Sequence, residues 1–445
     1  MEPEIPSIIK RNGESVPFDR ERIRVAIYKA TAATGAHDET LAEEATRQVV
    51  EALAQAYSAA EPATVEDIQD TVERVLIRSG NADVAKAFIV YRHERAKMRS
   101  GRRIVGGGNI PYRAMWQALD WAVEHDCHTV AALNRTLREG RLPALIEASE
   151  ARYEAGIAEA AKAVLARRDE LRFIIVAGPS SSGKTSTTHK LTEHLAAAGV
   201  PAVPLALDNY FFNLELHPGD EFGDRDFETP EALDLGLINE HLAAIDGGQP
   251  IEIPIYDFKT GRRLEETTPF AVPEGTVVVL DTLHGLFEPL TASVPDAHKF
   301  RLYIETISQL KDDDGRYARW TDLRLLRRMS RDSLFRAFDP EETILHWHYV
   351  RRSELKHIIA HQALADFHLN GALAYELPFL KRHCEHHLPP FLEKWRHDEK
   401  RLDGYIRAKR VHALLSSIDP IDDEALVPPT SVLREFIGGS VYDLH

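Results

Sequence analysis

The central part of the chain alternates short apolar runs with segments whose apolar residues recur at helical spacing. The apolar runs rich in Val, Ile and Leu occupy 171–178, 200–208, 276–286, 299–307 and 365–373. The segments with helical spacing occupy 184–199, 230–248 and 322–336. Apolar strands between helices predict an α/β fold, with a mostly parallel sheet covered by helices on both faces.

The first hundred residues have another pattern, that of a small α-rich unit with a short hairpin. Asn12 and Gly13 suit the turn of the hairpin, and Asp19 and Thr64 suit N-caps of helices. The predicted helices cover 20–35, 41–60, 65–80 and 84–98.

Three consecutive glycines within 101–112 predict a hinge after this unit, and the patterns on either side of the predicted sheet are helical. We therefore predict four parts, which are 1–100 as a small α-rich domain, 101–170 as hinge and helical connector, 171–375 as the α/β core and 376–445 as a helical extension.

Composition and charge restrict the function classes. The 445 residues are 44% hydrophobic and 28% charged, as in ordinary globular proteins, and the net charge of −16 disfavours nucleic acid as a partner. The two cysteines are too few for a disulfide framework or a four-thiolate zinc site. The N-terminus lacks a signal-peptide pattern, and no apolar stretch approaches the ~20 residues of a membrane helix. We expect a cytoplasmic protein without a membrane partner.

The segment from Gly178 to Thr185 fits the phosphate-loop pattern GxxxxGK[ST] between a strand and a helix. Loop amides and the helix N-terminus would hold phosphate, Lys184 would reach the β- and γ-phosphates, and Thr185 would bind Mg²⁺. A chance glycine turn is disfavoured because strand and helix are both in place. The predicted ATP-binding residues are Gly178, Ser180, Ser181, Ser182, Gly183, Lys184, Thr185 and Ser186.

Two carboxylates follow predicted strands of the same sheet. Asp208 could accept a proton from an attacking hydroxyl, or it could only cap a turn. Asp281 could hold Mg²⁺, or it could be an ordinary residue at a strand end.

Arginines cluster on one predicted helix, where Arg324, Arg328 and Arg331 share a face and Arg327 and Arg336 lie beside it. Like charges at this spacing favour an anion such as transferred phosphate. The alternative is a solvated face paired with carboxylates.

Together these motifs resemble the uridine kinase/phosphoribulokinase family of P-loop kinases over about 171–375. The flanking segments 132–161 and 432–440 look like a bacterial branch of uridine kinase-like proteins, in which the core carries extra flanking regions. LDNYF resembles the family's DxFY segment, which implies Asp208 as catalytic base beside Lys184. TDLRLLRRMSRD resembles the lid helix, which implies charge neutralisation by arginines of that helix. The substrate-binding residues implied by the resemblance are Asp208, Tyr210, Glu228, Tyr256, Arg263 and Arg328, and the catalytic arginines are Arg331 and Arg336.

Two positions depart from the family pattern. Gly261 stands where the family has a histidine that reads the pyrimidine edge, so base specificity is in doubt. Asp281 and Thr282 replace the usual Glu-Gly, but Asp281 with Thr185 still offers oxygen ligands for Mg²⁺.

Residues 5–95 resemble an ATP-cone, a regulatory nucleotide-binding module. The resemblance implies a second adenine nucleotide bound there, and a plain helical docking domain is the alternative. A zinc-ribbon repressor that also carries this module is disfavoured, because four metal-binding cysteines are lacking. The implied allosteric residues are Ile8, Lys10, Arg11, Asp19 and Arg22.

These observations predict a kinase that uses ATP and Mg²⁺ to phosphorylate a hydroxyl of a nucleoside, under control of the ATP-cone. A sugar phosphate or other small polyol is the alternative acceptor, and a non-catalytic nucleotide-sensing switch is the alternative function. We also expect a homo-oligomer. The histidines of the C-terminal third are expected to be structural or exposed, because neither HExxH nor a thiolate accompanies them.

Overall fold

A computed structural model of the protein describes residues 5–9, 15–34, 36, 38–58, 62–89, 111–217, 228–257, 260–336 and 338–444. Contacts divide the chain into two units, Met1–Ile110 and Pro111–His445. Residues 101–110 of the predicted hinge at 101–112 and the turn at Asn12 and Gly13 lie outside the described residues.

The first unit has the predicted hairpin and helices. Strands β1 (Ser7–Ile9) and β2 (Ser15–Pro17) pair antiparallel. Its helices include α1 (Arg20–Ala33), α2 (Glu39–Ala56) and α3 (Val65–Arg78), and residues 82–89 are also helical. Asp19 caps α1, and Thr64 forms a capping box with Asp67 at the start of α3, as the sequence predicts. Ile27, Leu53 and Leu76 are fully or almost fully buried and contribute to a core between the helices.

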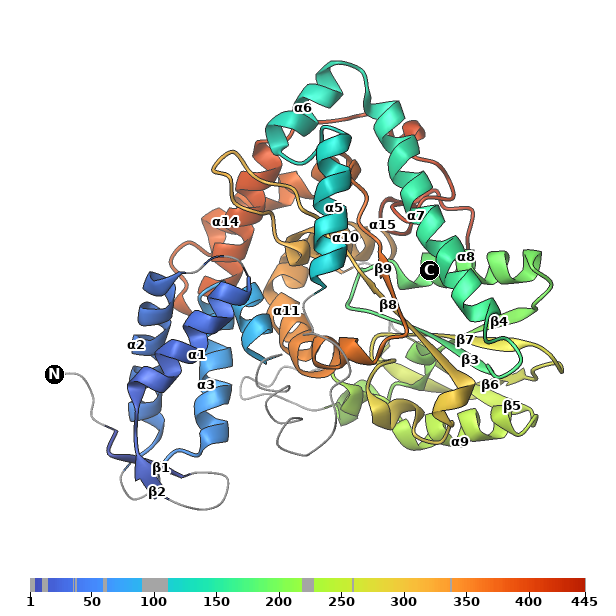
Figure 1. Ribbon diagram of the computed structural model, residues 1–445, viewed down its shortest axis with the longest axis horizontal. Helices are drawn as coiled ribbons and strands as arrows, with labels where there is room; N and C mark the ends of the chain where they lie inside the picture. The colour runs from blue at the N-terminus through green and yellow to red at the C-terminus, as the bar shows by residue number, and fades with distance from the viewer. Residues whose placement is uncertain are drawn as a thin grey trace. The chain divides into compact units, whose positions relative to one another are not determined.

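The second unit is built on a five-stranded sheet in which all strands are parallel, in the order β4-β7-β3-β8-β9 (Figure 1). The strands are β3 (Phe173–Ala177), β4 (Ala202–Ala206), β7 (Val277–Thr282), β8 (Lys299–Glu305) and β9 (Phe367–Asn370). Each corresponds to one of the predicted apolar runs. Their carboxyl ends therefore meet at one edge, where parallel sheets bind ligands.

Both faces of the sheet are covered. Ile174 and Val176 of β3 point into one hydrophobic core, and Phe173 and Ile175 point into the other. This alternation explains why β3 has no polar position. The first core includes helices α8 (Lys184–Ala197) and α10 (Trp320–Phe335), and the second includes α9 (Leu235–Asp246).

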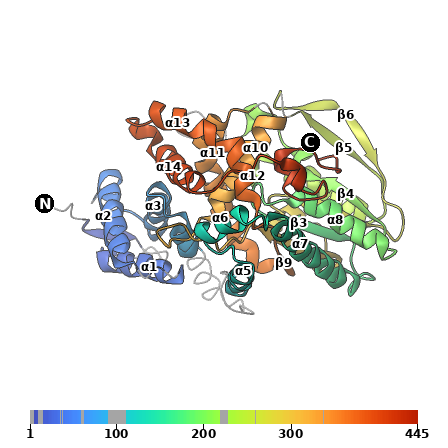
Figure 2. The ribbon, with the colours of Figure 1, turned by 90° about the horizontal axis from the view of Figure 1, so that it is seen from above.

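Helices before and after the sheet share the first core (Figure 2). Those before it are α5 (Tyr112–Glu124), α6 (Val130–Arg138) and α7 (Leu142–Leu165). Those after α10 are α11 (Pro340–Ser353), α12 (Glu376–Cys384), α13 (Leu388–Lys394), α14 (Leu402–Ser416) and α15 (Arg434–Ile437). The boundaries predicted near 170 and 375 therefore do not separate independent cores.

A two-stranded antiparallel hairpin of β5 (Ile251–Asp257) and β6 (Arg262–Phe270) was not predicted by the periodicity. Seven of the nine residues of β6 are exposed, so the strand lacks the apolar alternation that identifies a half-buried strand. Within the described part of the chain, no helix is both long and apolar enough to span a bilayer.

Candidate functional site

The phosphate loop joins the central strand β3 to the start of α8. Gly183 and Ser181 adopt positive φ angles of 94° and 59°. Glycine at 183 accommodates this left-handed backbone without strain. A side chain at Gly178 would meet the Ile304 carbonyl. The predicted loop therefore has the conformation that its glycines allow, and its amides lie at the N-terminus of α8, where anions bind.

Thr185 and Asp281 are in direct contact beside this loop. The Thr185 hydroxyl donates to Oδ2 of Asp281 at 2.8 Å. The register explains the contact, because Asp281 pairs with Val176 on the neighbouring strand, directly before the loop. Burial raises the pKa of Asp281 to about 6, although Lys184 opposes this shift. The hydroxyl and the carboxylate together offer hard oxygen donors of the kind that Mg²⁺ prefers.

Lys184 lies between acidic groups of the site. Its ammonium donates to the Pro179 carbonyl at 3.1 Å. Burial lowers its pKa, and the charges of Asp281 and Asp208 act in the opposite direction. The Lys184 side chain thus lies at the loop where phosphate would bind, with two carboxylates in electrostatic range.

Asp208 lies in a short 3₁₀ turn, Leu207–Tyr210, directly after β4. Burial raises the pKa of its carboxyl, while Arg336, Lys184 and Arg331 lower it. The structure thus brings the predicted base, the loop lysine and both predicted catalytic arginines within electrostatic range of one another. The interpretation of Asp208 as a mere turn residue does not explain this group of cations.

The arginines of α10 are not a solvated face. Arg324 and Arg327 are fully buried. Arg324 pairs with Glu354 and Glu305, and its guanidinium donates to the Ser180 carbonyl at 3.0 Å. Carboxylates compensate these charges, as the alternative interpretation of the sequence predicts. The ion pairs are buried, however, and Arg324 also contacts the phosphate loop.

Arg328, Arg331 and Arg336 lie nearer to the reactive groups. Arg328 is 2.5 Å from the Glu228 carboxylate, and it donates to the Ser180 hydroxyl at 3.1 Å. Arg331 pairs with Asp332 at 2.8 Å. Arg336 is partly exposed, and the neighbouring charge of Arg331 lowers its pKa to about 10.

Three predicted acceptor residues gather around the turn after β4 and the β5–β6 hairpin. Tyr256 is buried on β5, and its ring lies 5.6 Å from that of Phe211. Arg263 donates to the Tyr210 carbonyl at 2.9 Å. The Tyr210 ring is part of the second core, and its hydroxyl is hydrogen-bonded to Nδ1 of His241 at 2.9 Å. The structure therefore directs the Tyr210 hydroxyl toward α9.

Gly261 lies at the tip of that hairpin with a φ of 68°. Its carbonyl accepts from the Leu214 amide at 2.8 Å. A Cβ at this position would lie 3.0 Å from Cβ of Leu214. The backbone at 261 thus has a conformation that suits glycine. A histidine at this position would be strained and would crowd Leu214.

Two groups near the site were not singled out from the sequence. Nε2 of the buried His284 is 2.9 Å from the Glu228 carbonyl, which also accepts from Ser353. Burial lowers the pKa of His284 to about 3, so the ring is a neutral donor to that carbonyl. In the sequence, His284 could have been expected near the site only because it follows Asp281 by three residues. Glu435, which binds the start of α8, is the second of these groups.

The predicted allosteric residues are only partly described. Ile8 pairs with Val16 in the hairpin, and Asp19 caps α1. Arg22 is exposed, and its Nε is 3.1 Å from Asp19. Lys10 and Arg11 lie outside the described residues.

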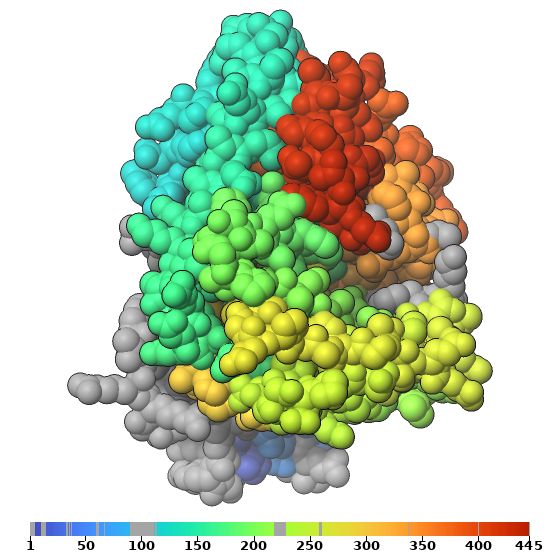
Figure 3. Space-filling view, turned by 90° about the vertical axis from the view of Figure 1, so that its right-hand side faces the viewer, coloured from blue at the N-terminus to red at the C-terminus, as the bar shows by residue number. Residues whose placement is uncertain are grey.

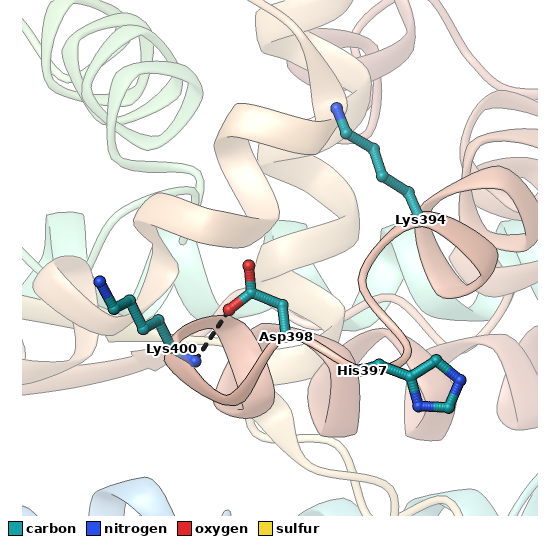
Figure 4. Close-up of a pocket in the computed structure, with 4 residues that line it drawn as sticks. All are labelled: Lys394, His397, Asp398 and Lys400. Atoms are coloured by element: carbon teal, nitrogen blue, oxygen red, sulfur yellow. Dashed lines mark hydrogen bonds between the residues drawn. The ribbon is translucent and has the colours of Figure 1, made fainter.

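An open hollow of about 610 Å³ lies on the C-terminal extension, lined by Lys394, His397, Asp398 and Lys400. Figure 4 shows that these side chains do not converge, and the one bond between them joins the Lys400 amide to Asp398. The hollow contains none of the predicted site residues. Among the described residues, no group of three or more His, Cys, Asp or Glu side chains could hold a metal ion. The pair of Thr185 and Asp281 contains only one such residue, so this finding does not concern it.

Comparison with known proteins shows which families this chain resembles. A family model described as ATP cone domain matches residues 6–97, and one described as Phosphoribulokinase / Uridine kinase family matches 173–370. A uridine kinase of Deinococcus deserti is 31% identical over 196 residues, which are 44% of this chain and 85% of that protein.

Two other relatives are matched over a smaller share of their length. A Halobacterium salinarum uridine kinase is 29% identical over 37% of this chain and 64% of that protein. A Schizosaccharomyces pombe uridine kinase is 32% identical over 38% of this chain and 34% of that protein. With its phosphate loop on the central strand of a parallel sheet, the chain belongs to the phosphoribulokinase/uridine kinase family, and it carries an ATP cone domain before the kinase region.

Proposed function

We propose that this protein is an ATP-dependent kinase that transfers the γ-phosphoryl group to a hydroxyl of a small molecule, with a nucleoside as the first candidate. The observation that carries the proposal is the contact between Thr185 and Asp281 beside Lys184, with Asp208 in electrostatic range of that lysine. These groups combine phosphate binding with a carboxylate that can accept a proton.

In the proposed complex the loop amides and Lys184 hold the phosphates. Thr185 and Asp281 fit Mg²⁺, since both supply oxygen donors and already lie in contact. When bound, the ion neutralises charge on the phosphate oxygens.

Asp208 orients the acceptor hydroxyl and takes its proton. The hydroxyl oxygen forms a bond to the γ-phosphorus, the bond from that phosphorus to the bridging oxygen breaks, and ADP leaves. Arg331 and Arg336 stand near Asp208 and balance the charge of the transferred group. Glu228, held by Arg328, together with Tyr256 and Arg263 forms the proposed acceptor pocket.

The acceptor class follows from the relatives and from one local feature. Relatives named uridine kinase favour a nucleoside. The hairpin at Gly261 favours weak discrimination between bases, or a sugar phosphate or other polyol, because that position offers no side-chain donor to a base edge.

The ATP cone supports regulation by a second adenine nucleotide. A change of homo-oligomer size is our proposed output. A purely nucleotide-sensing switch without turnover is disfavoured, because such a switch does not need Asp208 beside Lys184.

ADP release with Mg-ATP across a panel of nucleosides and sugar phosphates tests the function. We expect ADP release that depends on one acceptor class and is lost in Lys184→Ala. Absence of acceptor-dependent ADP release with both classes of acceptor would contradict the proposal. ADP release that persists in Lys184→Ala would show that a contaminating kinase causes the activity.

A further inference from the structure

The carboxylate of Glu435 lies on the first turn of α8, directly after the phosphate loop. The amide and the hydroxyl of Ser186 both donate to Oε2 of Glu435, at 3.1 and 2.7 Å. Glu435 is 4% exposed and Ser186 1% exposed. A charged group from the C-terminal segment thus takes two donors at the helix end that the loop presents to anions.

The segment that carries Glu435 is held against the loop by further contacts. The Ser330 hydroxyl of α10 donates to the Phe436 carbonyl at 2.8 Å, and the Arg327 guanidinium lies 4.9 Å from the Phe436 ring centre. A Cβ at Gly183 would lie 2.5 Å from Val432. Figure 3 shows the C-terminal segment, in red, against the green part of the surface that includes α8. Segment 431–437 therefore forms one wall of the loop.

The charge of Glu435 acts on the whole site. It is one of the charges that raise the pKa of Lys184 and of Asp281. Amides at the start of a helix favour a negative group, and a carboxylate is a substitute for a phosphate oxygen at such donors. A nucleotide phosphate that approaches Ser186 meets both an occupied donor pair and a like charge.

We propose that Glu435 is a built-in competitor for nucleotide phosphate at the loop, and that nucleotide binding displaces it and loosens segment 431–437. This inference rests on the proposed function, because it requires that the loop bind a nucleotide. It makes the C-terminal segment a gate on the nucleotide site.

The test compares Mg-ADP binding to the full chain and to Glu435→Gln. The amide keeps the size of the side chain and removes its charge. We expect the Kd of the loop site to fall about tenfold, which corresponds to one charge-assisted hydrogen bond. The double variant Glu435→Gln/Lys184→Ala should lose the tighter binding, which assigns it to the loop rather than to the ATP cone.

Glu424→Gln is the matched control, because Glu424 lies in the same extension and pairs with His383 at 2.7 Å, away from the loop. Its Kd for Mg-ADP should equal that of the unmodified chain. An unchanged or higher Kd in Glu435→Gln overturns the proposal and leaves Glu435 as a helix cap.

Amide hydrogen exchange on the unmodified chain provides a test that does not depend on a variant. We expect saturating Mg-ADP to speed amide exchange in segment 431–437, and unchanged or slower exchange there overturns the gate. The two hypotheses fail differently. If ADP release is normal and the Kd for Mg-ADP does not change in Glu435→Gln, only the gate is overturned. If the Kd falls in Glu435→Gln but no acceptor-dependent ADP release is found, the proposed kinase function is overturned.

Discussion

Arg327 and Glu376 form a buried ion pair in which Nε and Nη2 of the guanidinium lie 2.5 and 3.0 Å from the two carboxylate oxygens. The same guanidinium donates to the carbonyls of Gly371 and Ser182, at 2.8 and 3.3 Å. A single arginine on α10 therefore connects α12, the end of β9 and the phosphate loop.

Removal of this arginine should destabilise the fold and the loop together. Arg327→Met leaves the Glu376 carboxylate buried without its partner, which costs about 3–5 kcal/mol of unfolding free energy. Urea unfolding measures this loss, and KM for ATP should rise. Arg168→Met is the control, since Arg168 belongs to an exposed pair and should change stability by less than about 1 kcal/mol. Equal effects of the two substitutions would contradict the supporting role of Arg327.

Asp208→Asn should separate binding from chemistry. The amide cannot accept the proton of the acceptor, so kcat should fall by about 10²-fold or more. Nucleotide affinity, measured by calorimetry, should stay within a few-fold because Lys184 and the loop remain. Undiminished turnover would remove Asp208 from the mechanism.

Asp281 should weaken the nucleotide-free fold at neutral pH. Its pKa is raised from 3.8 to about 6, so the folded chain binds a proton in this window that the unfolded chain has released, and stability falls as pH rises through it. Asp281→Asn should therefore be more stable than the unmodified chain by about 1–3 kcal/mol near pH 7, with no gain below pH 4.

Urea unfolding in chelator across this pH range checks the effect of Asp281. Asp169→Asn is the control, because Asp169 is almost fully exposed. A stability gain of Asp281→Asn that does not depend on pH would show that burial of the charge is not its cause.

Gly261→His should fail to restore base reading. The left-handed backbone costs an L-residue about 1–2 kcal/mol, and the new Cβ would crowd Leu214. We expect a lower Tm and no gain in preference for pyrimidine nucleosides in the acceptor panel. A gain in uridine selectivity at unchanged Tm would show that the hairpin adapts to a side chain.

Two nucleotide sites should be separable by calorimetry. Lys184→Ala should leave one adenine-nucleotide site, in the ATP cone, and the double change Lys10→Ala/Arg11→Ala should leave the one in the kinase region. Coupled sites typically shift each other's affinity by about 1–3 kcal/mol. If deletion of 1–100 leaves the response of the kinase to ATP and dATP unchanged, the cone is only a structural appendage.

Patterns among neighbouring residues predicted the strands of the sheet, the helix caps and the phosphate loop. The apolar runs gave all five strands of the parallel sheet, and the caps at Asp19 and Thr64 lie where short-range hydrogen bonding demands. The phosphate loop was predictable because its glycines, its lysine and the adjoining helix are contiguous.

Contacts across long separations were not predictable. Arg324 and Arg327 have partners 30 and 49 residues away in Glu354 and Glu376, so the helix pattern alone could not show that they are buried. Glu435 is 249 residues from Ser186. Specific pairings of this kind depend on how α10, α12 and α15 pack, which periodicity does not specify.

The contact between Glu435 and Ser186 also determines when the nucleotide site is complete during synthesis. Ribosomes make Ser186 249 residues before Glu435, so the loop is synthesised long before the segment that forms its wall. A nascent chain that ends before Val432 has every loop residue and lacks the wall. A stop codon in place of the codon for Val432 would therefore release a chain whose loop lacks this wall, although α7 to α14 would be present to fold around the sheet.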